Sequence, residues 1–500
     1  MKKIKINYPF LLLISILFIG SCSKNLDINQ DPSTFNLDDS PTEQLIVNGM
    51  ITTAINLGAN YNFACNMWSQ YWASGPGISV NPIDVHTLLG SNAVVTRGWT
   101  QAYSRAMYDL FTVVKRTNSA HQKGVCQLML AYNYQLLTDC FGDIPFSEAL
   151  KALPSDGGIV SPKYDEASTV YDGIIALVDE AITNLNTSET IEGLTSSVDP
   201  MYGGDINKWL KFANTLKLKL YVRQFETNPS AITNARALID AGTLFIGSNE
   251  NAQIAFTTPP GANTNLNPLF ASLESRTSTG NYFVLSNTTL DALNAKSDLR
   301  LNALYNLPSN PAVTVHTGIP QGSGGGGSIA NLSTPGSYTY GRNVPVIFIS
   351  SWESKFLQAE ALARSGSSGD DETAFNDAVS ESFGFLGLAS DASDYLSLNP
   401  FDATDIESKV KSIAYEKWVS MNAVQSTESW IESRRYDTPT RIVFRGTGGI
   451  FNLPVGNTLA LGTGYPVIFP YSGDEVSSNK NVPAQRVDIS NPAYKTFWDN

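Results

Sequence analysis

Apolar residues spaced by threes and fours recur along much of the chain, and this pattern constrains the fold more than any other feature. The clearest stripe runs from Val170 to Leu185, and another runs from Trp209 to Leu220. This spacing places side chains on one face of an α-helix, so each stretch predicts a helix with one buried side. Similar stripes occur at 99–110, 128–136 and 406–421. Paired helices joined by variable loops indicate a helical-repeat scaffold, although no fixed period recurs.

Two segments lack this periodicity and are rich in Thr, Asn, Pro and Gly, at about residues 243–349 and 441–500. They predict loops with a few short strands, such as one at 345–349. Aromatic residues such as Phe270 and Phe283 are interleaved with the polar ones, which indicates a packed insertion. We therefore expect one mainly α domain over 39–500, with the helical scaffold mainly in 39–242 and 350–440. Loops on a rigid scaffold are a common place for binding residues.

The N-terminus has the features of a bacterial lipoprotein signal. A cationic start precedes an uncharged apolar run from Pro9 to Ile19, which is shorter than the roughly 20 residues that a membrane-spanning helix needs. Ile19-Gly20-Ser21 lead directly into Cys22, in a pattern that resembles a lipobox. We expect residues 1–21 to be removed, Cys22 to carry acyl chains such as palmitate, and residues 22–38 to form a flexible tether. The alternative is a conventional cleavage site with Cys22 beside it.

The charge and the cysteines exclude several classes of protein. A formal net charge of −13 argues against binding to nucleic acid or anionic lipid, which needs clustered Lys and Arg. Cys65, Cys126 and Cys140 remain once Cys22 is assigned, and they show no CxxC spacing. They predict neither a disulfide framework nor a zinc cluster. One bridge is an open alternative to three buried thiols that act as small apolar side chains.

Catalytic and metal-binding signatures are scarce. The three histidines, His86, His121 and His316, stand apart in the sequence, and no common metal or nucleotide motif is present in a fitting context. The densest charged constellation lies at 428–435, where helical spacing brings Glu432 near Arg435. This favours a neutralised structural ion network over a catalytic carboxylate pair, because a general acid needs a raised pKa. We expect no catalytic residue, no metal and no cofactor other than the lipid.

Aromatic side chains are the best candidates for binding. Trp68 and Trp72 lie in one short aromatic stretch, and Arg276, Asn281 and Tyr282 lie in the loop-rich insertion. Aromatic rings stack on the apolar faces of sugars while polar neighbours bind the hydroxyls, as in other sites with a mostly apolar lining. Trp68 and Trp72 are four residues apart, so the alternative for them is a buried stripe of the core.

Several motifs, in order along the chain, resemble those of the SusD/RagB family of nutrient-binding outer-membrane lipoproteins of Bacteroidetes, and in particular its SusD-like subgroup. The segment Phe141 to Ala149 resembles an FGDxPxxEA signature, and 297–301 resembles a DPRL motif whose proline is replaced. The other matching segments are 162–165, 170–171, 179–181, 203–218, 318–322, 416–418 and 428–435. Together they cover most of the chain.

The resemblance implies irregular tetratricopeptide-like helix pairs that pack on a SusC-like TonB-dependent transporter, with loops on the other side that hold a ligand. It also implies a non-enzymatic, surface-exposed lipoprotein that captures a glycan or another nutrient and delivers it to the transporter. The family's ligand residues vary with the nutrient, so the five candidates above rest on their position alone. The competing interpretations are a lipid-anchored glycoside hydrolase and an adhesive surface protein without a small ligand.

Overall fold

The structure is a computed structural model, and it describes residues 40–76, 81–189, 193–257, 265–274, 283–324, 327–366, 369–457 and 464–499. The predicted signal peptide, Cys22 and the whole predicted tether lie outside these residues. The candidates Arg276, Asn281 and Tyr282 also lie outside them. The bounds of the single domain stay a prediction.

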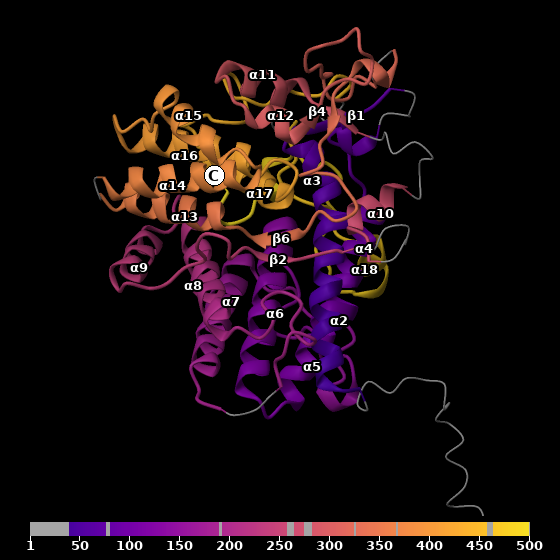
Figure 1. The fold of residues 1–500 in the computed structure, drawn as a ribbon. Coiled ribbons are helices and arrows are strands. Elements are labelled where there is room, and N and C mark those ends of the chain that lie inside the picture. Colours follow the sequence, from indigo (N-terminus) through magenta and orange to yellow (C-terminus); the bar gives the residue numbers. More distant parts are fainter. Residues whose placement is uncertain are drawn as a thin grey trace, which may run out of the picture.

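Helices dominate the described chain, as the periodicity predicts. Most of the N-terminal helices stand side by side in the lower half of Figure 1, whereas α3 lies against α17 (Ser426–Tyr436) and α9 against α13 (Ser351–Arg364). The N-terminal helices are α2 (Thr42–Ile55), the π-helix η2 (Asn56–Tyr61), α3 (Asn62–Trp68), α4 (Ala93–Gln101), the π-helix η4 (Ala102–Met107), α5 (Tyr108–Arg116), α6 (Ala120–Phe141), α7 (Ala167–Leu185), α8 (Ile206–Arg223) and α9 (Pro229–Asp240). The segments α2, η2 and α3 follow one another without a break, as do α4, η4 and α5.

A second group of helices forms the other half of the scaffold (Figure 1). It consists of α13 (Ser351–Arg364), α14 (Asp370–Phe385), α15 (Ala392–Leu398), α16 (Ile406–Ser420) and α17 (Ser426–Tyr436). The pairs α6/α7 and α13/α14 make the most extensive helix-to-helix contacts, so neighbours in sequence pack together. This confirms the predicted mainly α fold of irregular helix pairs.

The described residues form three two-stranded antiparallel sheets, and every strand except β1 lies in the insertion between the two halves. Their strands are β1 (Trp72–Ser74) with β3 (Phe283–Leu285), β2 (Ala252–Ile254) with β6 (Val346–Ile349), and β4 (Tyr305–Asn306) with β5 (Thr334–Pro335). Strand β6 confirms the short strand expected at 345–349. Short helices complete the loop-rich parts, namely α10 (Pro268–Glu274), α11 (Asn287–Ala295), α12 (Arg300–Leu304) and α18 (Gly473–Ser478). Among the described helices, none is both long and apolar enough to cross a membrane.

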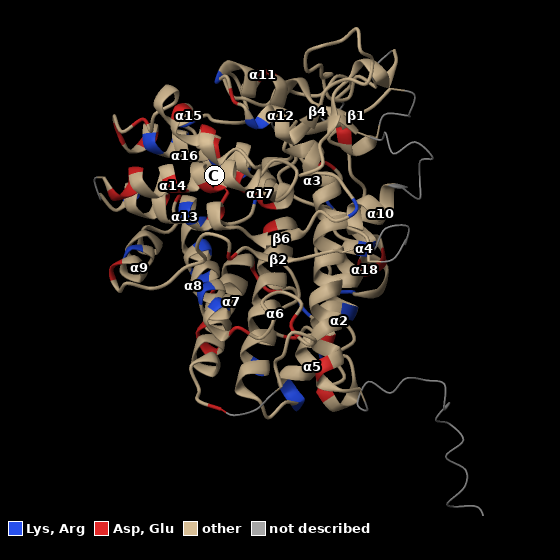
Figure 2. Cartoon of the chain, in the orientation of Figure 1, with Lys and Arg blue, Asp and Glu red and all other residues tan. Residues whose placement is uncertain are grey.

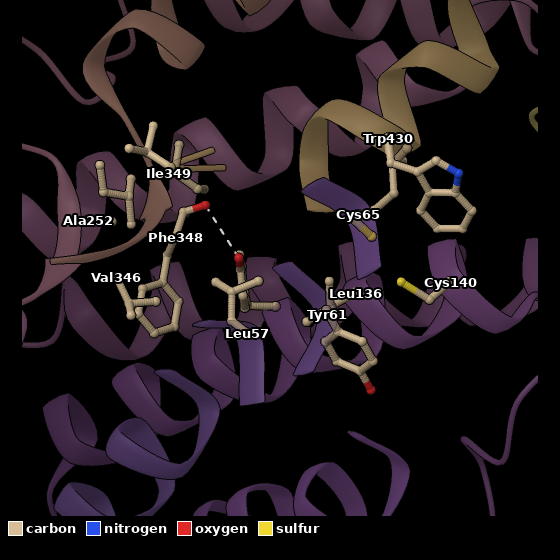
Figure 3. Close-up of a cluster of buried hydrophobic side chains, with 14 of the residues drawn as sticks. Leu57, Tyr61, Cys65, Leu136, Cys140, Ala252, Val346, Phe348, Ile349 and Trp430 are labelled. Atoms are coloured by element: carbon tan, nitrogen blue, oxygen red, sulfur yellow. Dashed lines mark hydrogen bonds between the residues drawn. The ribbon is translucent and has the colours of Figure 1, made fainter. Parts of the chain in front are cut away.

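The core joins the insertion to both helical groups. Figure 3 shows Leu57 and Tyr61 of η2 in the same buried cluster as Leu136 of α6 and Phe348 of β6. The Tyr132 hydroxyl on α6 donates to the backbone carbonyl of Phe348 at 3.3 Å. Trp430 of α17 lies in the same cluster, so strand β6 and the helices η2, α6 and α17 are fixed against one another by apolar packing.

The cysteines of this core carry no disulfide. Cys65, Cys126 and Cys140 are all buried and free, and burial raises the pKa of each thiol. A buried thiol with a raised pKa stays protonated and packs as a small apolar side chain. The structure thus selects the unbridged alternative.

The segment that begins at Phe141 acts as architecture. Gly142 ends α6 with a positive φ of 69°, a conformation that glycine adopts without strain. The Asp143 carboxylate accepts a hydrogen bond from the backbone N–H of Ala167 at 2.9 Å, at the first residue of α7. The backbone of Ile144 pairs with that of Asp165. One short motif therefore ends one helix and caps the next.

Candidate ligand-binding site

Trp68 and Trp72 lie in the core. Trp68 is 2% exposed, and its ring packs at 5.0 Å from Trp430 and 4.9 Å from Phe469. Trp72 is fully buried in β1, and its ring stacks on Phe283 at 5.1 Å. Both rings are enclosed by protein, so the geometry places them as core residues rather than as ligand contacts. This is the alternative that their spacing of four had left open.

A cavity of about 680 Å³ lies between α2–η2, α4, η3 (Pro82–Val85) and α10. Its volume falls within the roughly 300–1,000 Å³ that is common for small-molecule sites. Apolar side chains form part of the wall, among them Ile51, Ile55 and Phe63. The polar part includes Asn60, Asn81, Asn92, Arg97, Gln101 and Asn265. We call this cavity the amide cavity.

Helix α4 supplies one wall of the amide cavity. Val94, Arg97 and Gln101 line it, and their spacing of three and four places them on one face of the helix. Arg97 is exposed, and within the described chain its guanidinium has neither an ion pair nor a hydrogen bond. The described lining contains no aspartate or glutamate, so Arg97 is its only charged side chain.

The opposite wall includes the π-helix η2. The i→i+5 bonds of a π-helix widen the turn and change which residues share a face, and such segments are frequent at functional sites. Here the Asn56 Nδ2 donates to the Gly98 carbonyl at 2.9 Å, which crosses from η2 to α4. The Asn60 Nδ2 then donates to Asn56 Oδ1 at 2.8 Å and to Gln101 Oε1 at 2.9 Å. Three carboxamides thus join the two walls.

Two further asparagines line the cavity as helix caps. The Asn81 Oδ1 accepts from the backbone N–H of Ile83 at 3.0 Å at the start of η3. The Asn92 Oδ1 accepts from the backbone N–H of Val94 at 2.9 Å at the start of α4. Capping fixes both side chains, because the oxygen must face the helix N–H groups. The Nδ2 group of each is left for another partner.

The residues of this cavity were missed by sequence reasoning because none belongs to a motif. Asn60, Gln101 and Arg97 are ordinary residues within helical periodicity, and only the packing of η2 against α4 brings them together. The asparagines before helices are recognisable as caps, but a cap alone does not indicate a binding site. Trp68 and Trp72 carried a stronger signal in the sequence, and both are buried.

The charged constellation at 428–435 is a buried ion network, as its spacing predicts. Glu432 pairs with Arg435 at 2.7 Å and with Lys417 at 2.9 Å. Glu428 pairs with Lys219 of α8 at 2.7 Å and with Arg223, and Figure 2 shows further basic positions along α8. The surrounding cations hold the pKa of Glu428 well below its usual range, against the opposing effect of burial. An ionised, paired glutamate is unsuited to act as a general acid.

Each of the three histidines contacts a different part of the described chain. The His86 ring is fully buried, and its Nδ1 lies 2.9 Å from the Gly464 carbonyl. His316 contacts Ser333 and Asn302, and His121 contacts the Thr187 carbonyl. Within the described chain no group of three His, Cys, Asp or Glu side chains is placed to hold a metal ion.

A second cavity of about 490 Å³ lies between η4 and α18, and a third of about 400 Å³ lies beside α13 and α14.

The structure is therefore a mainly helical fold of irregular helix pairs with an amide-lined cavity. Residues 34–447 match the model of the SusD-like family, which is described as starch-binding and associating with the outer membrane. The chain therefore belongs to the SusD-like family. No curated protein matches the chain.

Solved structures share this fold. A SusD/RagB family protein from Bacteroides thetaiotaomicron is similar with a TM-score of 0.74 and 20% identity, over 92% of this chain and 99% of that one. A chitin-binding protein is similar with a TM-score of 0.72 and 20% identity, over 92% of this chain and 100% of that one. A chitin-binding SusD homologue from Flavobacterium johnsoniae gives a TM-score of 0.70 and 18% identity, over 91% and 99%. At these identities the similarity shows the fold alone.

Proposed function

We propose that this protein captures a saccharide nutrient in the amide cavity, without cleaving it, and delivers it to a SusC-like TonB-dependent transporter in the outer membrane. Lipid at Cys22 holds it at the cell surface. The family description supports a saccharide ligand and the outer membrane. The names of two structural relatives refer to chitin binding.

The lining of the amide cavity is the observation that carries this proposal. Apolar side chains such as Ile51, Ile55 and Phe63 offer surface to the CH faces of a sugar ring. Carboxamides at Asn81, Asn92 and Gln101 offer hydrogen bonds to its oxygens. A mostly apolar wall with a few fixed polar groups is the usual composition of a ligand site.

The described lining of the amide cavity does not support the competing hypothesis that the protein is a glycoside hydrolase. Most such enzymes place two carboxyl groups about 5 to 10 Å apart across the scissile bond. The described lining of the amide cavity contains no carboxylate. The cavity beside α18 includes Asp474 and Glu475, but Glu475 is already bonded to Tyr164 and Asn479.

The test is a binding titration of the purified chain without residues 1–22 against a panel of oligosaccharides, with product analysis of each mixture. We expect saturable binding and unchanged saccharides. Ala93→Trp places a large side chain in the amide cavity from an exposed position and should abolish binding. Thr183→Trp, on the exposed side of α7, is the matched control and should bind normally. Shortened products, or equal binding by the Ala93→Trp variant, would contradict the proposal.

The anchor and the partner are tested in cells. Cys22→Ala should release the protein from the outer membrane while the purified domain keeps its affinity for saccharide. Solubilised wild-type protein should co-purify with a TonB-dependent transporter. A variant that stays in the membrane fraction would show that Cys22 is not the point of attachment.

A further inference from the structure

We infer that the amide cavity is built for a saccharide unit that carries a negatively charged group, such as the carboxylate of a uronic acid. This inference rests on the proposed function and names the class of its ligand. It follows from Arg97 and from the carboxamide donors of Asn81, Asn92 and Gln101, which all line the cavity.

The first step is the orientation of the carboxamide chain, which the backbone determines. The Gly98 carbonyl can only accept, so Asn56 must present Nδ2 to it and Oδ1 to Asn60. Asn60 must then donate with Nδ2, and Gln101 must accept with Oε1. The Gln101 Nε2 is therefore the end of that side chain that remains available. The orientation of Gln101 therefore follows from the Gly98 carbonyl, to which it is linked through Asn56 and Asn60.

The second step concerns the two caps. Asn81 and Asn92 use their oxygens on backbone N–H groups, so only their Nδ2 donors remain. Among the four carboxamides that these bonds orient, Asn60 alone has an oxygen that accepts none of them. The fifth lining carboxamide, Asn265, donates its Nδ2 to the Thr257 carbonyl at 3.2 Å. Three of the five lining carboxamides thus keep a donor for a ligand and use their oxygen within the protein. A neutral sugar hydroxyl both donates and accepts, whereas a carboxylate only accepts and matches a lining of donors.

The third step is Arg97, whose charge is not neutralised by any residue that the structure describes. Most other described arginines are paired; for example, Arg435 and Arg300 each bind carboxylates in the core. Arg97 lies in the middle of α4 and lines the cavity, and the described lining contains no carboxylate. A guanidinium presents two parallel N–H groups that fit a carboxylate. The net charge of −13 opposes an anion at long range, so this recognition is local.

The experiment compares acidic oligosaccharides with their own methyl esters. Galacturonate, glucuronate and mannuronate oligomers each have a methyl ester of the same length and stereochemistry without the charge. We expect the wild-type chain without residues 1–22 to bind at least one acid form about 10- to 100-fold more tightly than its ester, the range for a charge-assisted hydrogen bond. Added salt should weaken the acid form only.

Two variants test whether the preference for the acid form over its ester depends on Arg97. Arg97→Gln should bind the acid and the ester about equally, since the charge preference resides in this guanidinium. Arg105→Gln makes the same change at an exposed position of η4 outside the cavity, and should keep the preference of the wild type. Thermal unfolding of both variants should match that of the wild type, because neither side chain has a described ion pair or hydrogen bond.

The possible outcomes separate this inference from the proposed function. Neutral saccharides that bind as well as acidic ones, or a preference that survives in Arg97→Gln, would overturn the inference and leave the proposed function standing. If no saccharide of either kind binds, the proposed function fails as well. A preference for the acid form that disappears only in Arg97→Gln supports both.

Discussion

Arg435 and Glu360 form a two-pronged ion pair in the core, with Nη1–Oε1 and Nη2–Oε2 distances of 2.7 Å each. The pair joins α17 to α13, and both side chains are fully buried. Arg435 also holds the pKa of the Glu360 carboxylate far below its usual range, against the effect of burial. Two helices that are 75 residues apart in sequence are therefore linked by charge as well as by apolar packing.

Glu360→Gln should lower the free energy of unfolding by about 3 kcal/mol, because it removes one of the two carboxylates that neutralise the buried Arg435. Urea unfolding followed by circular dichroism measures this. Asp240→Asn breaks the exposed pair of Asp240 with Arg236 on α9 and is the matched control. It should cost less than about 0.5 kcal/mol. Equal costs for the two variants would show that the network is not what secures α17 to α13.

His86 should make the protein less stable in mild acid. Burial lowers the pKa of its ring to about 4 from 6.5. Between these values the unfolded chain binds a proton that the folded chain does not, so the free energy of unfolding falls as the pH decreases from 6.5 to 4. The loss from this residue is at most about 3 kcal/mol.

The variant that isolates this effect is His86→Asn, since His86 has a positive φ of 64° and asparagine tolerates that conformation. Urea unfolding of wild type and variant at pH 7.5, 6.0 and 4.5 gives their difference in stability. That difference should shift in favour of the variant as the pH falls. A difference that stays constant across the three pH values would refute the assignment.

The hydrogen bonds among Asn56, Asn60 and Gln101 fix which end of each carboxamide donates and which accepts. Asn56→Asp tests this orientation. The substitution replaces the Nδ2 donor by an oxygen that faces the Gly98 carbonyl. We expect a loss of about 1–3 kcal/mol in the free energy of unfolding, the cost of an unsatisfied buried group. Asn48→Asp on α2 is the control, because Asn48 is exposed and already accepts from Gln44. The same urea titration serves both variants, and an unaffected Asn56→Asp protein would argue against the fixed polarity.

Replacement of two helical glycines by alanine should change the stability of the protein in opposite directions. A Cβ on Gly124 of α6 would lie 2.9 Å from Leu185 Cγ and 3.0 Å from the Ala181 carbonyl oxygen, both on α7. Gly124→Ala should therefore cost about 1–3 kcal/mol through overpacking. A Cβ on Gly384 of α14 meets nothing within 4 Å. Gly384→Ala should stabilise the protein by about 0.5–1 kcal/mol through higher helix propensity, and thermal unfolding should rank the two variants on either side of the wild type.

The local spacing of apolar residues was sufficient to predict the helices of the scaffold. The stripe from Val170 to Leu185 became α7, the stripe from Trp209 to Leu220 lies in α8, and the apolar run at 345–349 became β6. Such patterns are readable because the burial of one helix face depends on spacing within a single element. The ion pair within 428–435 could be predicted for the same reason, since Glu432 and Arg435 lie one turn apart on α17. The motifs in family order likewise identified the SusD-like family that the comparison shows.

The candidate site was decided by tertiary structure. Trp68 and Trp72 have the residue type expected of a sugar site, but whether an aromatic ring faces a ligand or the core depends on what packs against it. Conversely, Asn60 and Gln101 are 41 residues apart, and their hydrogen bond exists because η2 lies against α4. The sequence by itself determined which segments are helices and to which family they belong, because those properties depend on residues that are close along the chain. Only the fold decided which carboxamides and which arginine share a cavity, because that depends on how separate helices pack.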